Sequence, residues 1–368
     1  MKVIVSGGGT GGHIYPAITI VRAMRERVPE AEFLYVGTKH GMESDIVPKE
    51  GLPFVTVELQ GFERHISLVN VKRAGMAMVG VGRAMRIVKR FRPDVAIGTG
   101  GYVCGPILMA ASLLGIPTLI QEQNVVPGIT NRLLSHFVTR IAAGVPEAMR
   151  HFPAKKVVCT GNPIRKDVVT AGREEGLEAF GLDGSRRIVL VSGGSRGARS
   201  INQAMIGVLK EAADHPEVQF LHVTGKLDYD DVIRQLSEAG VDLEACRHIQ
   251  VRPYLYNMPQ ALAVADLAIF RAGAIGLAEL MARGIPSILV PYPYAAENHQ
   301  EHNARAVMAA GAAHMILNKD LDAGTLGAAL KELLGSPERL AKMAEASRAL
   351  GKPGAAGEIA DMALSIMK

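Results

Sequence analysis

Short apolar segments alternate with helical patterns along the whole chain of 368 residues, and this alternation limits the folds that the chain can adopt. In the first half, the strands predicted from these segments are residues 2–6, 32–36, 54–57, 95–98, 118–121, 140–143 and 157–160. Helical patterns, such as those at 17–28 and 106–114, separate most of them. Strands that are apolar throughout indicate parallel sheets covered by helices on both faces. The sequence therefore predicts an α/β protein with doubly wound parallel sheets.

The same pattern restarts at Arg187 with a strand at 188–192, a glycine turn at 193–197 and a helix at 198–213. Further strands are predicted at 219–223, 248–251, 267–270 and 287–290. Both halves thus open with a strand, a glycine-rich loop and a helix, which is typical of two Rossmann-like domains. We expect a first domain at residues 1–163 and a second at 164–352. The last segment, 353–368, is predicted as a short helix that could pack back on the first domain.

The charge and the composition of the chain indicate which kinds of ligand or macromolecule it is expected to bind. The net charge of +5 and the pI near 9.1 favour anionic partners. Aromatic residues make up only 5% of the chain, Trp is absent and no nucleic-acid-binding module is recognisable, so no nucleic-acid partner is expected. Cys104, Cys159 and Cys246 form neither a metal pattern nor a disulfide framework, which fits a reducing compartment. The uncharged stretch 95–120 is broken by Gly and Pro, so strands and a helix explain it better than a membrane span.

The first glycine loop satisfies the pattern G-x-G-x-x-G with Gly7, Gly9 and Gly12, after a strand and before a helix. Such a loop can present backbone N–H groups to an anion. A dinucleotide site also needs an acidic residue about twenty positions later, at the end of the second strand, and neither half of the chain has one there. Two tight turns without a ligand remain the alternative. His13 directly follows the glycines and is a candidate base for an attacking hydroxyl, although a lone His is more often structural.

Two polar clusters follow strands of the second half. Residues 270–279 combine small side chains with Glu279, whose carboxylate could accept both hydroxyls of a ribose or could simply favour the positive end of a helix. Residues 290–300 form a turn stiffened by proline, with amide and carboxylate groups suited to sugar hydroxyls. In open α/β sheets, ligands bind at the carboxyl ends of the strands, where both clusters are expected.

Six motifs in this order resemble those of the MurG family, the N-acetylglucosaminyltransferases of bacterial cell-wall assembly. They are Gly7–His13, Gly100-Gly101-Tyr102-Val103-Cys104-Gly105-Pro106, Gln121-Glu122-Gln123-Asn124, Gly161-Asn162-Pro163-Ile164-Arg165, Gly193-Gly194-Ser195-Arg196-Gly197-Ala198 and the segment 271–279. The resemblance extends over nearly the whole chain and implies the GT-B fold, in which two Rossmann-like domains face each other across a cleft.

The resemblance also implies a reaction. N-acetylglucosamine would pass from UDP-N-acetylglucosamine (UDP-GlcNAc) to the 4-hydroxyl of the muramoyl sugar on undecaprenyl-pyrophosphoryl-MurNAc-pentapeptide (lipid I). The anomeric centre would invert, and lipid II would form for peptidoglycan synthesis. No cofactor and no metal ion are implied, and the enzyme would be a peripheral protein on the cytoplasmic face of the bacterial plasma membrane. A GT-B glycosyltransferase with another acceptor, a UDP-sugar epimerase and a non-catalytic binding scaffold are the alternatives.

The matching motifs assign roles to individual residues. The residues implied to hold the UDP-sugar are Arg165, Ser195, Leu255, Ala274, Ile275, Gly276, Leu277, Ala278, Glu279 and Gln300. Those implied on the acceptor side are Thr10, Gly11, Gly12 and Asn124, with His13 as the first choice of base and Glu122 as the second. Ala272 and Gly276 stand where the family often has hydroxyl side chains, so side-chain hydrogen bonds at these two positions are in doubt.

A lipid-linked acceptor also implies a surface that faces a membrane. Residues 64–92 contain no acidic residue, and their basic residues are Arg64, Lys72, Arg73, Arg83, Arg86, Lys89, Arg90 and Arg92. An apolar stretch at 74–82 lies among them. Basic residues around an apolar patch favour an anionic bilayer surface. A helix with a buried apolar face and a solvated basic face is the alternative.

Overall fold

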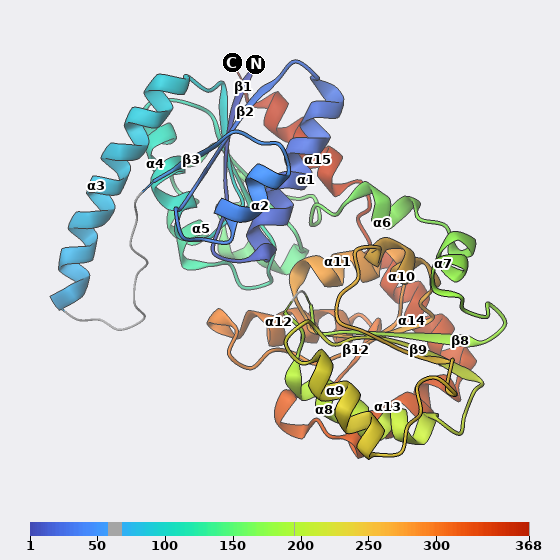
Figure 1. The fold of residues 1–368 in the computed structure, drawn as a ribbon. Helices are drawn as coiled ribbons and strands as arrows, with labels where there is room; N and C mark the ends of the chain where they lie inside the picture. Colours follow the sequence, from blue (N-terminus) through green and yellow to red (C-terminus); the bar gives the residue numbers. More distant parts are fainter. Residues whose placement is uncertain (58–67, 195, 368) are drawn as a thin grey trace. The chain divides into compact units, whose positions relative to one another are not determined.

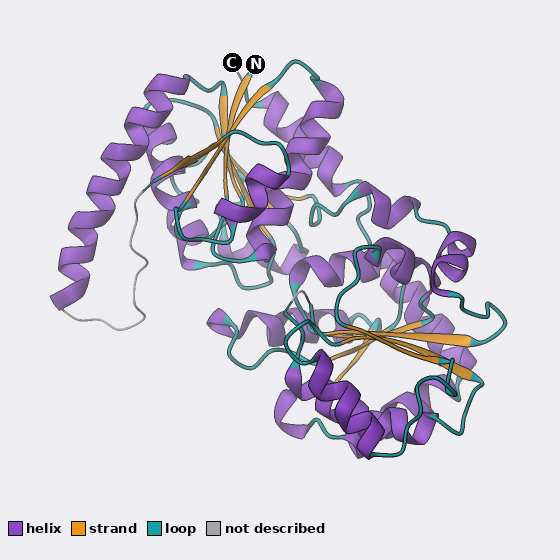
Figure 2. Cartoon of the chain, viewed as in Figure 1, coloured by secondary structure: helices purple, strands orange, loops and turns teal. Residues whose placement is uncertain are grey.

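The computed structural model describes residues 1–57, 68–194 and 196–367, and the chain divides into two compact units (Figure 1). Unit 1 comprises Met1–Ile164 and Pro353–Lys368, and unit 2 comprises Arg165–Lys352. Every pair of neighbouring strands in the described residues is parallel. The two parallel sheets, each lying among helices in Figure 2, confirm the predicted fold class of two Rossmann-like domains.

Unit 1 contains a seven-stranded sheet in the order β3-β2-β1-β4-β5-β6-β7. Its strands are β1 (Lys2–Ser6), β2 (Glu32–Gly37), β3 (Phe54–Thr56), β4 (Val95–Gly98), β5 (Thr118–Glu122), β6 (Arg140–Ala143) and β7 (Val157–Cys159). Its helices are α1 (Gly11–Arg27), α2 (Glu43–Lys49), α3 (Leu68–Phe91), α4 (Cys104–Leu113), α5 (Ile129–Leu134), the 3₁₀ helix η1 (Pro146–His151) and α15 (Ala355–Ser365).

Unit 2 contains a six-stranded sheet in the order β10-β9-β8-β11-β12-β13. Its strands are β8 (Arg187–Ser192), β9 (Val218–Val223), β10 (Ile249–Arg252), β11 (Leu267–Phe270), β12 (Ser287–Leu289) and β13 (Ala313–Met315). Its helices are α6 (Lys166–Thr170), α7 (Arg173–Phe180), α8 (Arg199–Ala212), α9 (Tyr229–Glu238), α10 (Met258–Val264), α11 (Ala274–Arg283), η2 (Ala296–Asn298), α12 (His299–Ala309), η3 (Asn318–Asp320), α13 (Ala323–Leu334) and α14 (Pro337–Leu350).

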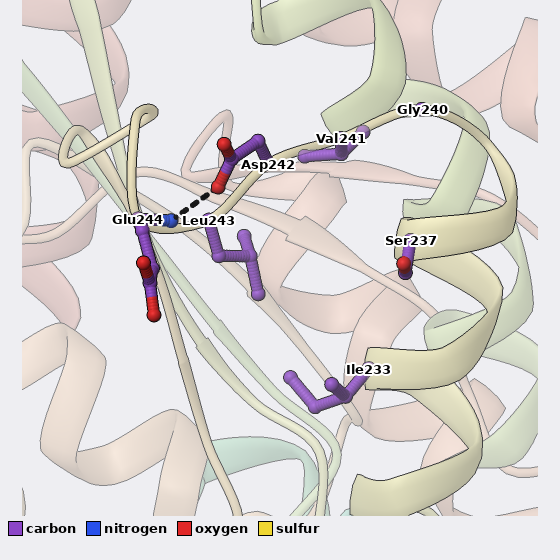
Figure 3. Close-up of a pocket in the computed structure, with 7 residues that line it drawn as sticks. All are labelled: Ile233, Ser237, Gly240, Val241, Asp242, Leu243 and Glu244. Carbon is purple, nitrogen blue, oxygen red and sulfur yellow. Dashed lines mark hydrogen bonds between the residues drawn. The ribbon is translucent and has the colours of Figure 1, made fainter.

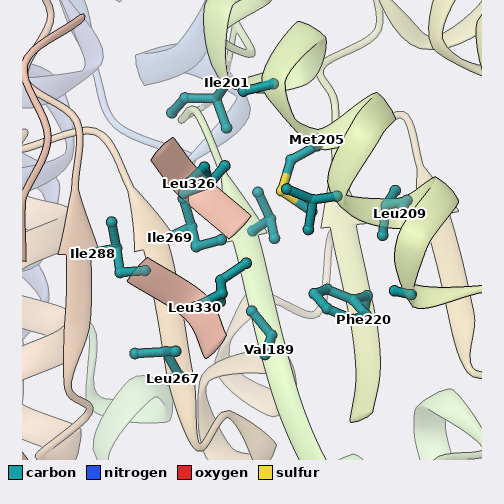
Figure 4. Packing of buried hydrophobic residues seen from close by; sticks show 14 of the residues in the cluster. Val189, Ile201, Met205, Leu209, Phe220, Leu267, Ile269, Ile288, Leu326 and Leu330 are labelled. Atoms are coloured by element: carbon teal, nitrogen blue, oxygen red, sulfur yellow. The ribbon is translucent and has the colours of Figure 1, made fainter. Parts of the chain in front are cut away.

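The central strands are apolar on both faces because helices cover both sides of each sheet. In unit 2, side chains of the strands meet those of α8 and α13 in one buried cluster (Figure 4). Met205 and Leu209 come from α8, Leu330 comes from α13, and all three pack with strand residues such as Val189 and Ile269. Burial of one such aliphatic side chain contributes about 1.5–3 kcal/mol, so the sheet and its helices stabilise each other.

The last helix, α15, belongs to unit 1 and packs against α1, beside which it lies in Figure 1. Ile359 and Ala363 are fully buried in the same cluster as Ile14 and Ala17. At the surface, Arg27 donates a hydrogen bond of 2.9 Å from Nη2 to Asp361. None of the helices among the described residues combines the length and the apolar character needed to cross a bilayer.

Candidate active site

In unit 1, two glycine loops at the carboxyl edge of the sheet are tied together. The loop after β1 donates from the Gly8 N–H to the Gly100 carbonyl at 3.3 Å, and the Thr99 hydroxyl donates to the His13 carbonyl at 2.7 Å. Gly101 has a φ of +82°, and a Cβ there would lie 2.3 Å from the Gly8 oxygen. A side chain at 101 is therefore excluded both by backbone conformation and by space. The two motifs form one structure at the β1–β4 switch point, where open α/β sheets bind ligands.

His13 lies half-buried in the first turn of α1, and its ring is held from one side. Nδ1 is 3.0 Å from the Thr99 carbonyl oxygen and 3.1 Å from Oε1 of Gln123. Both neighbours are oxygen acceptors, so Nδ1 carries the hydrogen in the neutral ring and Nε2 carries the lone pair. An imidazole in this tautomer is equipped to take a proton through Nε2.

Glu122, the second candidate base, ends β5, and both its carboxylate oxygens accept hydrogen bonds from the loop after β5 and from α5. Oε1 accepts from the backbone N–H of Asn124 at 3.0 Å, and Oε2 accepts from the side chain of Asn131 at 2.8 Å and from the Gly128 N–H at 3.2 Å. The side chain is 1% exposed. These contacts assign Glu122 to holding the loop after β5, and they favour His13 as the base. Asn124 also donates its side-chain amide to Glu122, at 3.2 Å.

The other predicted acceptor-side residues form the start of α1. Thr10 is the N-cap and Gly11 begins the helix, while Thr10 and Gly12 are exposed. The first backbone N–H groups of a helix have no partner within it, and the helix dipole favours negative charge there. The structure thus brings Thr10, Gly11, Gly12 and His13 together on one turn.

Glu43 is a further residue at the carboxyl edge of this sheet, and no sequence motif indicates it. It begins α2, is fully buried, and accepts from the Gly9 N–H at 3.1 Å. Its other oxygen accepts from the Thr38 backbone N–H at 3.0 Å and from the Thr38 hydroxyl at 2.7 Å. Glu43 therefore fixes the glycine loop to the end of β2. The signal in the sequence was weak, because a single carboxylate in a turn forms no motif.

We expect Glu43→Ala to lower the free energy of unfolding by about 2–4 kcal/mol, because the buried donors of Thr38 and the Gly9 N–H lose their acceptor. Urea unfolding measures the change. Glu30→Ala, at an exposed position of the same unit, is the matched control and should stay within about 0.5 kcal/mol of wild type. Equal stability of the two variants would contradict this role of Glu43.

In unit 2, the corresponding glycine loop follows β8 and lies against the loop after β9. Gly197 has a φ of +77°, and a Cβ there would lie 2.0 Å from the Thr224 oxygen. The loop leads into α8, so a helix amino terminus lies next to it, as anion sites require. Ser195, one of the residues implied to hold the UDP-sugar, lies outside the described residues.

Glu279 and Arg165 both lie in unit 2, where the charge of Arg165 acts on the Glu279 carboxylate. Glu279 lies half-buried on the second turn of α11, whose first residues are Ala274, Ile275, Gly276, Leu277 and Ala278. Burial raises the pKa of Glu279 to about 7, while the positive charge of Arg165 opposes the rise and Asp167 adds to it. No hydrogen-bond partner of this carboxylate is found in the described part of the chain. A desolvated carboxylate that accepts no hydrogen bond from the described residues, near the start of the helix after β11, is suited to a ligand with hydroxyl groups.

Arg271 is a second residue that the predicted set did not include. Nη1 donates to the carbonyls of Val290 and Pro291, each at 3.1 Å, and Nη2 donates to the Ser200 hydroxyl at 2.8 Å. Burial lowers the pKa of Arg271 to about 10. Its partners among the described residues are neutral, so its positive charge remains available to an anionic ligand at this edge.

The remaining donor-side residues follow β10 and β12. Leu255 is buried just after β10. Gln300, on α12, accepts from the Tyr292 N–H at 3.0 Å and so closes the turn after β12. Within that turn, Glu297 and Asn298 have φ values of +54° and +50°. Such conformations of non-glycine residues cost about 1–3 kcal/mol each and cluster at functional sites.

A hollow of about 500 Å³ on unit 2 is separate from all these residues (Figure 3). Its lining comes from α9 and the loop before β10, including Ile233, Ser237 and Leu243. That loop leads into the amino end of β10, whereas the candidate site residues follow the carboxyl ends of strands. The hollow therefore does not belong to the candidate site.

Ala272 and Gly276 stand where the family often has hydroxyl side chains, and the structure shows what surrounds each position. The Ala272 carbonyl accepts from the Asn303 side chain at 3.3 Å. A Cβ at Gly276 would meet its first neighbour, in Phe270, at 3.7 Å, which is ordinary van der Waals contact. The space for a small side chain at 276 is therefore present.

Comparisons with known proteins assign the chain to a family. Residues 3–143 match the glycosyltransferase family 28 N-terminal domain, and residues 188–359 match its C-terminal domain. A UDP-N-acetylglucosamine–N-acetylmuramyl-(pentapeptide) pyrophosphoryl-undecaprenol N-acetylglucosamine transferase of Desulforamulus reducens is 48% identical over 98% of this chain and 97% of its own length. The transferase of the same name from Moorella thermoacetica is 47% identical over 100% of both chains.

Solved structures agree with this assignment. The crystal structure of Acinetobacter baumannii MurG is 28% identical, covers 99% of both chains and superposes with a TM-score of 0.80. A UDP-GlcNAc 2-epimerase from Neisseria meningitidis, 15% identical with a TM-score of 0.67 over 99% of this chain and all of its own, shares the fold alone. The chain therefore belongs to glycosyltransferase family 28 and, within it, to the UDP-N-acetylglucosamine–N-acetylmuramyl-(pentapeptide) pyrophosphoryl-undecaprenol N-acetylglucosamine transferases.

Proposed function

We propose that the chain transfers N-acetylglucosamine from UDP-GlcNAc to the 4-hydroxyl of the muramoyl sugar of lipid I, with inversion, and so forms lipid II. Beyond the family assignment, the observation that carries this proposal is the pairing of two features. Unit 1 presents a His13 ring whose Nε2 carries a lone pair, and unit 2 presents the desolvated carboxylate of Glu279, which accepts no hydrogen bond from the described residues.

Unit 2 binds the donor in this proposal. Glu279 accepts the ribose hydroxyls, and the glycine loop with the start of α8 faces the diphosphate. Arg271 and Arg165 supply positive charge as the diphosphate leaves. The backbone at Leu255 holds the uracil, and Gln300 contacts the sugar hydroxyls. Gln300 is already fixed in the turn by the Tyr292 N–H, so its side-chain amide is oriented before the sugar arrives.

Unit 1 binds the acceptor and supplies the base. The first N–H groups of α1, at Thr10, Gly11 and Gly12, face the lipid pyrophosphate, and Asn124 contributes an amide. The acceptor 4-oxygen forms a bond to the anomeric carbon, and the bond from that carbon to UDP breaks with its electron pair leaving on UDP. The hydroxyl proton passes to Nε2 of His13. A single displacement of this kind inverts the anomeric centre.

Two alternatives within the same fold make different products. A UDP-sugar epimerase would convert the donor without any acceptor, and a glycosyltransferase with another acceptor would ignore a lipid I analogue. We expect UDP release from UDP-GlcNAc that depends on a short-chain lipid I analogue. No release with the analogue would refute the proposal, and conversion of the sugar without an acceptor would favour an epimerase.

The acceptor is carried by a lipid, and we propose that unit 1 meets the cytoplasmic membrane surface through an apolar patch at the ends of α4 and α5. Its residues are Leu113, Ile129, Leu133 and Phe137, which are 60%, 57%, 65% and 53% exposed. Ser112 donates to the Phe137 carbonyl at 2.8 Å, so the end of α4 lies against the segment after α5. Exposed large apolar side chains in one place mark a binding surface.

Basic residues accompany this patch. Arg86, Lys89 and Arg90 are exposed on α3, which packs against α4 through Ala84 and Val88. They belong to the basic segment at 64–92, of which Arg64 and the side chains of Lys72 and Arg73 lie outside the described residues. A basic residue near an anionic bilayer contributes about 1 kcal/mol. The sequence predicts the apolar part of the membrane-facing surface at 74–82, and that prediction stays untested because the side chains of residues 68–78 lie outside the described residues. No sequence pattern indicates the patch on α4 and α5, because its four residues are scattered along the chain.

We expect the triple variant with Leu113, Leu133 and Phe137 changed to Ser to bind anionic liposomes at least tenfold more weakly. Burial of one such side chain in an apolar environment contributes about 1.5–3 kcal/mol, and each substitution removes that contribution to binding. Turnover of a soluble acceptor analogue should persist. Leu227→Ser is the control, since Leu227 is 81% exposed on unit 2. Liposome binding equal to that of the control variant would overturn the assignment of the patch.

A further inference from the structure

In unit 1, three buried side-chain amides form a hydrogen-bonded series that ends at the Nδ1 atom of His13. Gln121, Gln123 and Asn162 are 0%, 2% and 3% exposed. Gln121 lies in β5, Gln123 lies just after β5, and Asn162 lies in the loop after β7. The Asn162 side chain donates to the Gln123 carbonyl at 3.0 Å, and the Gln121 side chain donates to Oδ1 of Asn162 at 2.9 Å. The Gln123 side chain then donates to Oε1 of Gln121 and, at 2.7 Å, to the Thr99 carbonyl.

The partners at the two ends of this series fix the orientation of every amide. The carbonyls of Gln123 and Thr99 can only accept hydrogen bonds, so the NH₂ groups of Asn162 and Gln123 must face them. The oxygen of Asn162 therefore faces Gln121, whose NH₂ donates to it. Gln121 then offers its oxygen to the NH₂ of Gln123. The same assignment results from either end, so one arrangement satisfies all of these groups.

This arrangement has a consequence for His13. With its NH₂ directed at Gln121 and Thr99, Gln123 can present only its oxygen to the imidazole, 3.1 Å from Nδ1. An oxygen there requires a hydrogen on Nδ1 and leaves the lone pair on Nε2. We propose that Gln121, Gln123 and Asn162 form an amide relay that sets the tautomer and the orientation of the His13 ring. This role rests on the proposed function, in which His13 is the base.

Gln123 is thus a positioning residue that acts through direct contact with His13, and Gln121 acts one step further away. The relay predicts that their effects are not additive, because Gln121 influences His13 only by orienting Gln123. The Thr99 carbonyl, 3.0 Å from Nδ1, remains in every variant of these residues and limits the size of the effect. We expect a loss in kcat of about tenfold for Gln123→Met, roughly that of one hydrogen bond.

The test is a cycle of Gln121→Met, Gln123→Met and the double variant, with kcat, both KM values and unfolding measured for each protein. The relay predicts a lower kcat with both KM values within about twofold of wild type, and a double variant no slower than Gln123→Met. The relay would be overturned if the losses of kcat in the two single variants added up in the double variant. It would also be overturned if each loss of kcat were explained by a smaller fraction of folded protein. Asn124→Ala, in the same loop but outside the relay, shows what a change in acceptor contacts does to KM.

A second measurement does not depend on activity. Histidine-selective ¹⁵N labelling reports the His13 tautomer by NMR, with the signal assigned by its absence from His13→Ala. We expect one tautomer with hydrogen on Nδ1 in the wild type and a measurable minor fraction with hydrogen on Nε2 in Gln123→Met, in which the Thr99 carbonyl still accepts from Nδ1 but the Gln123 oxygen is lost. A single unchanged tautomer in Gln123→Met would refute the relay. Normal turnover of His13→Ala would instead refute the base role and leave the tautomer result standing, so the two failures are distinguishable.

Discussion

His13→Ala should lower turnover of UDP-GlcNAc and a soluble lipid I analogue by about 10²–10⁴-fold, the usual contribution of a general base. The reason is the ring geometry, in which two oxygens hold Nδ1 and leave the lone pair of Nε2 for the acceptor hydroxyl. Donor affinity, measured by titration with UDP-GlcNAc, should stay within about twofold of wild type, because unit 2 carries the donor contacts in this proposal. Steady-state release of UDP provides the rate.

His136→Ala is the matched control, since His136 is exposed in the same unit. It should retain wild-type turnover. Near-normal turnover in His13→Ala, together with an inactive but folded Glu122→Gln, would move the role of base to Glu122. The four hydrogen bonds that Glu122 accepts from the loop after β5 and from α5 argue against that outcome.

Glu279→Ala should weaken UDP-GlcNAc binding by about 10–100-fold, because hydrogen bonds to a charged group contribute about 1.5–3 kcal/mol. Binding by wild type should also weaken as the pH falls below 7, because burial raises the pKa of Glu279 to about 7 and the ionised form accepts both ribose hydroxyls. The donor is a diphosphate diester and stays ionised over this range, so the dependence reports the protein. Calorimetric titration at pH 6 and pH 8 measures it.

Ionisation of the same carboxylate favours donor binding but lowers the stability of the folded protein. In the unfolded chain Glu279 ionises near its ordinary pKa of 4.5, whereas the folded protein keeps the proton up to about pH 7. The unfolded state therefore binds fewer protons between these values, and stability falls as the pH rises through them. Glu279→Gln should be more stable than wild type by about 1–3 kcal/mol at pH 8, with the difference shrinking towards pH 5.

Glu338→Gln is the control for a carboxylate at a helix start, because Glu338 is exposed in the first turn of α14. The free energy of unfolding of Glu338→Gln should differ little from that of wild type. The difference should not grow as the pH rises from 5 to 8, as it is expected to do for Glu279→Gln. Tight donor binding by a folded Glu279→Ala would contradict the ribose role.

The alternation of strands and helices was sufficient to predict the fold class, because parallel strands buried on both faces are apolar along their whole length. The strands at Lys2–Ser6, Val95–Gly98, Arg140–Ala143 and Leu267–Phe270 were predicted to the residue. Helix α1 was predicted from residue 17 and begins at Gly11. Pro16 and the glycines indicate a break, yet buried Ile14 packs in the unit 1 core and favours the longer helix.

The strand β13, at Ala313–Met315, was missed because three residues give too short an apolar pattern. In the candidate site, the parallel topology made it possible to predict which loops share an edge. It could not reveal the contacts within that edge. The contact of His13 with Gln123 and the burial of Glu43 under the glycine loop depend on tertiary packing between segments far apart in the sequence. No spacing rule applies to such pairs.

The most direct test of transfer to the muramoyl 4-hydroxyl compares two acceptors with the wild-type enzyme and UDP-GlcNAc. One is a short-chain lipid I analogue, and the other is the same molecule without the muramoyl 4-hydroxyl. We expect UDP release above the acceptor-free rate only with the intact analogue, and a product with the inverted β linkage at that position. Equal release with both acceptors, or a retained linkage, would contradict it.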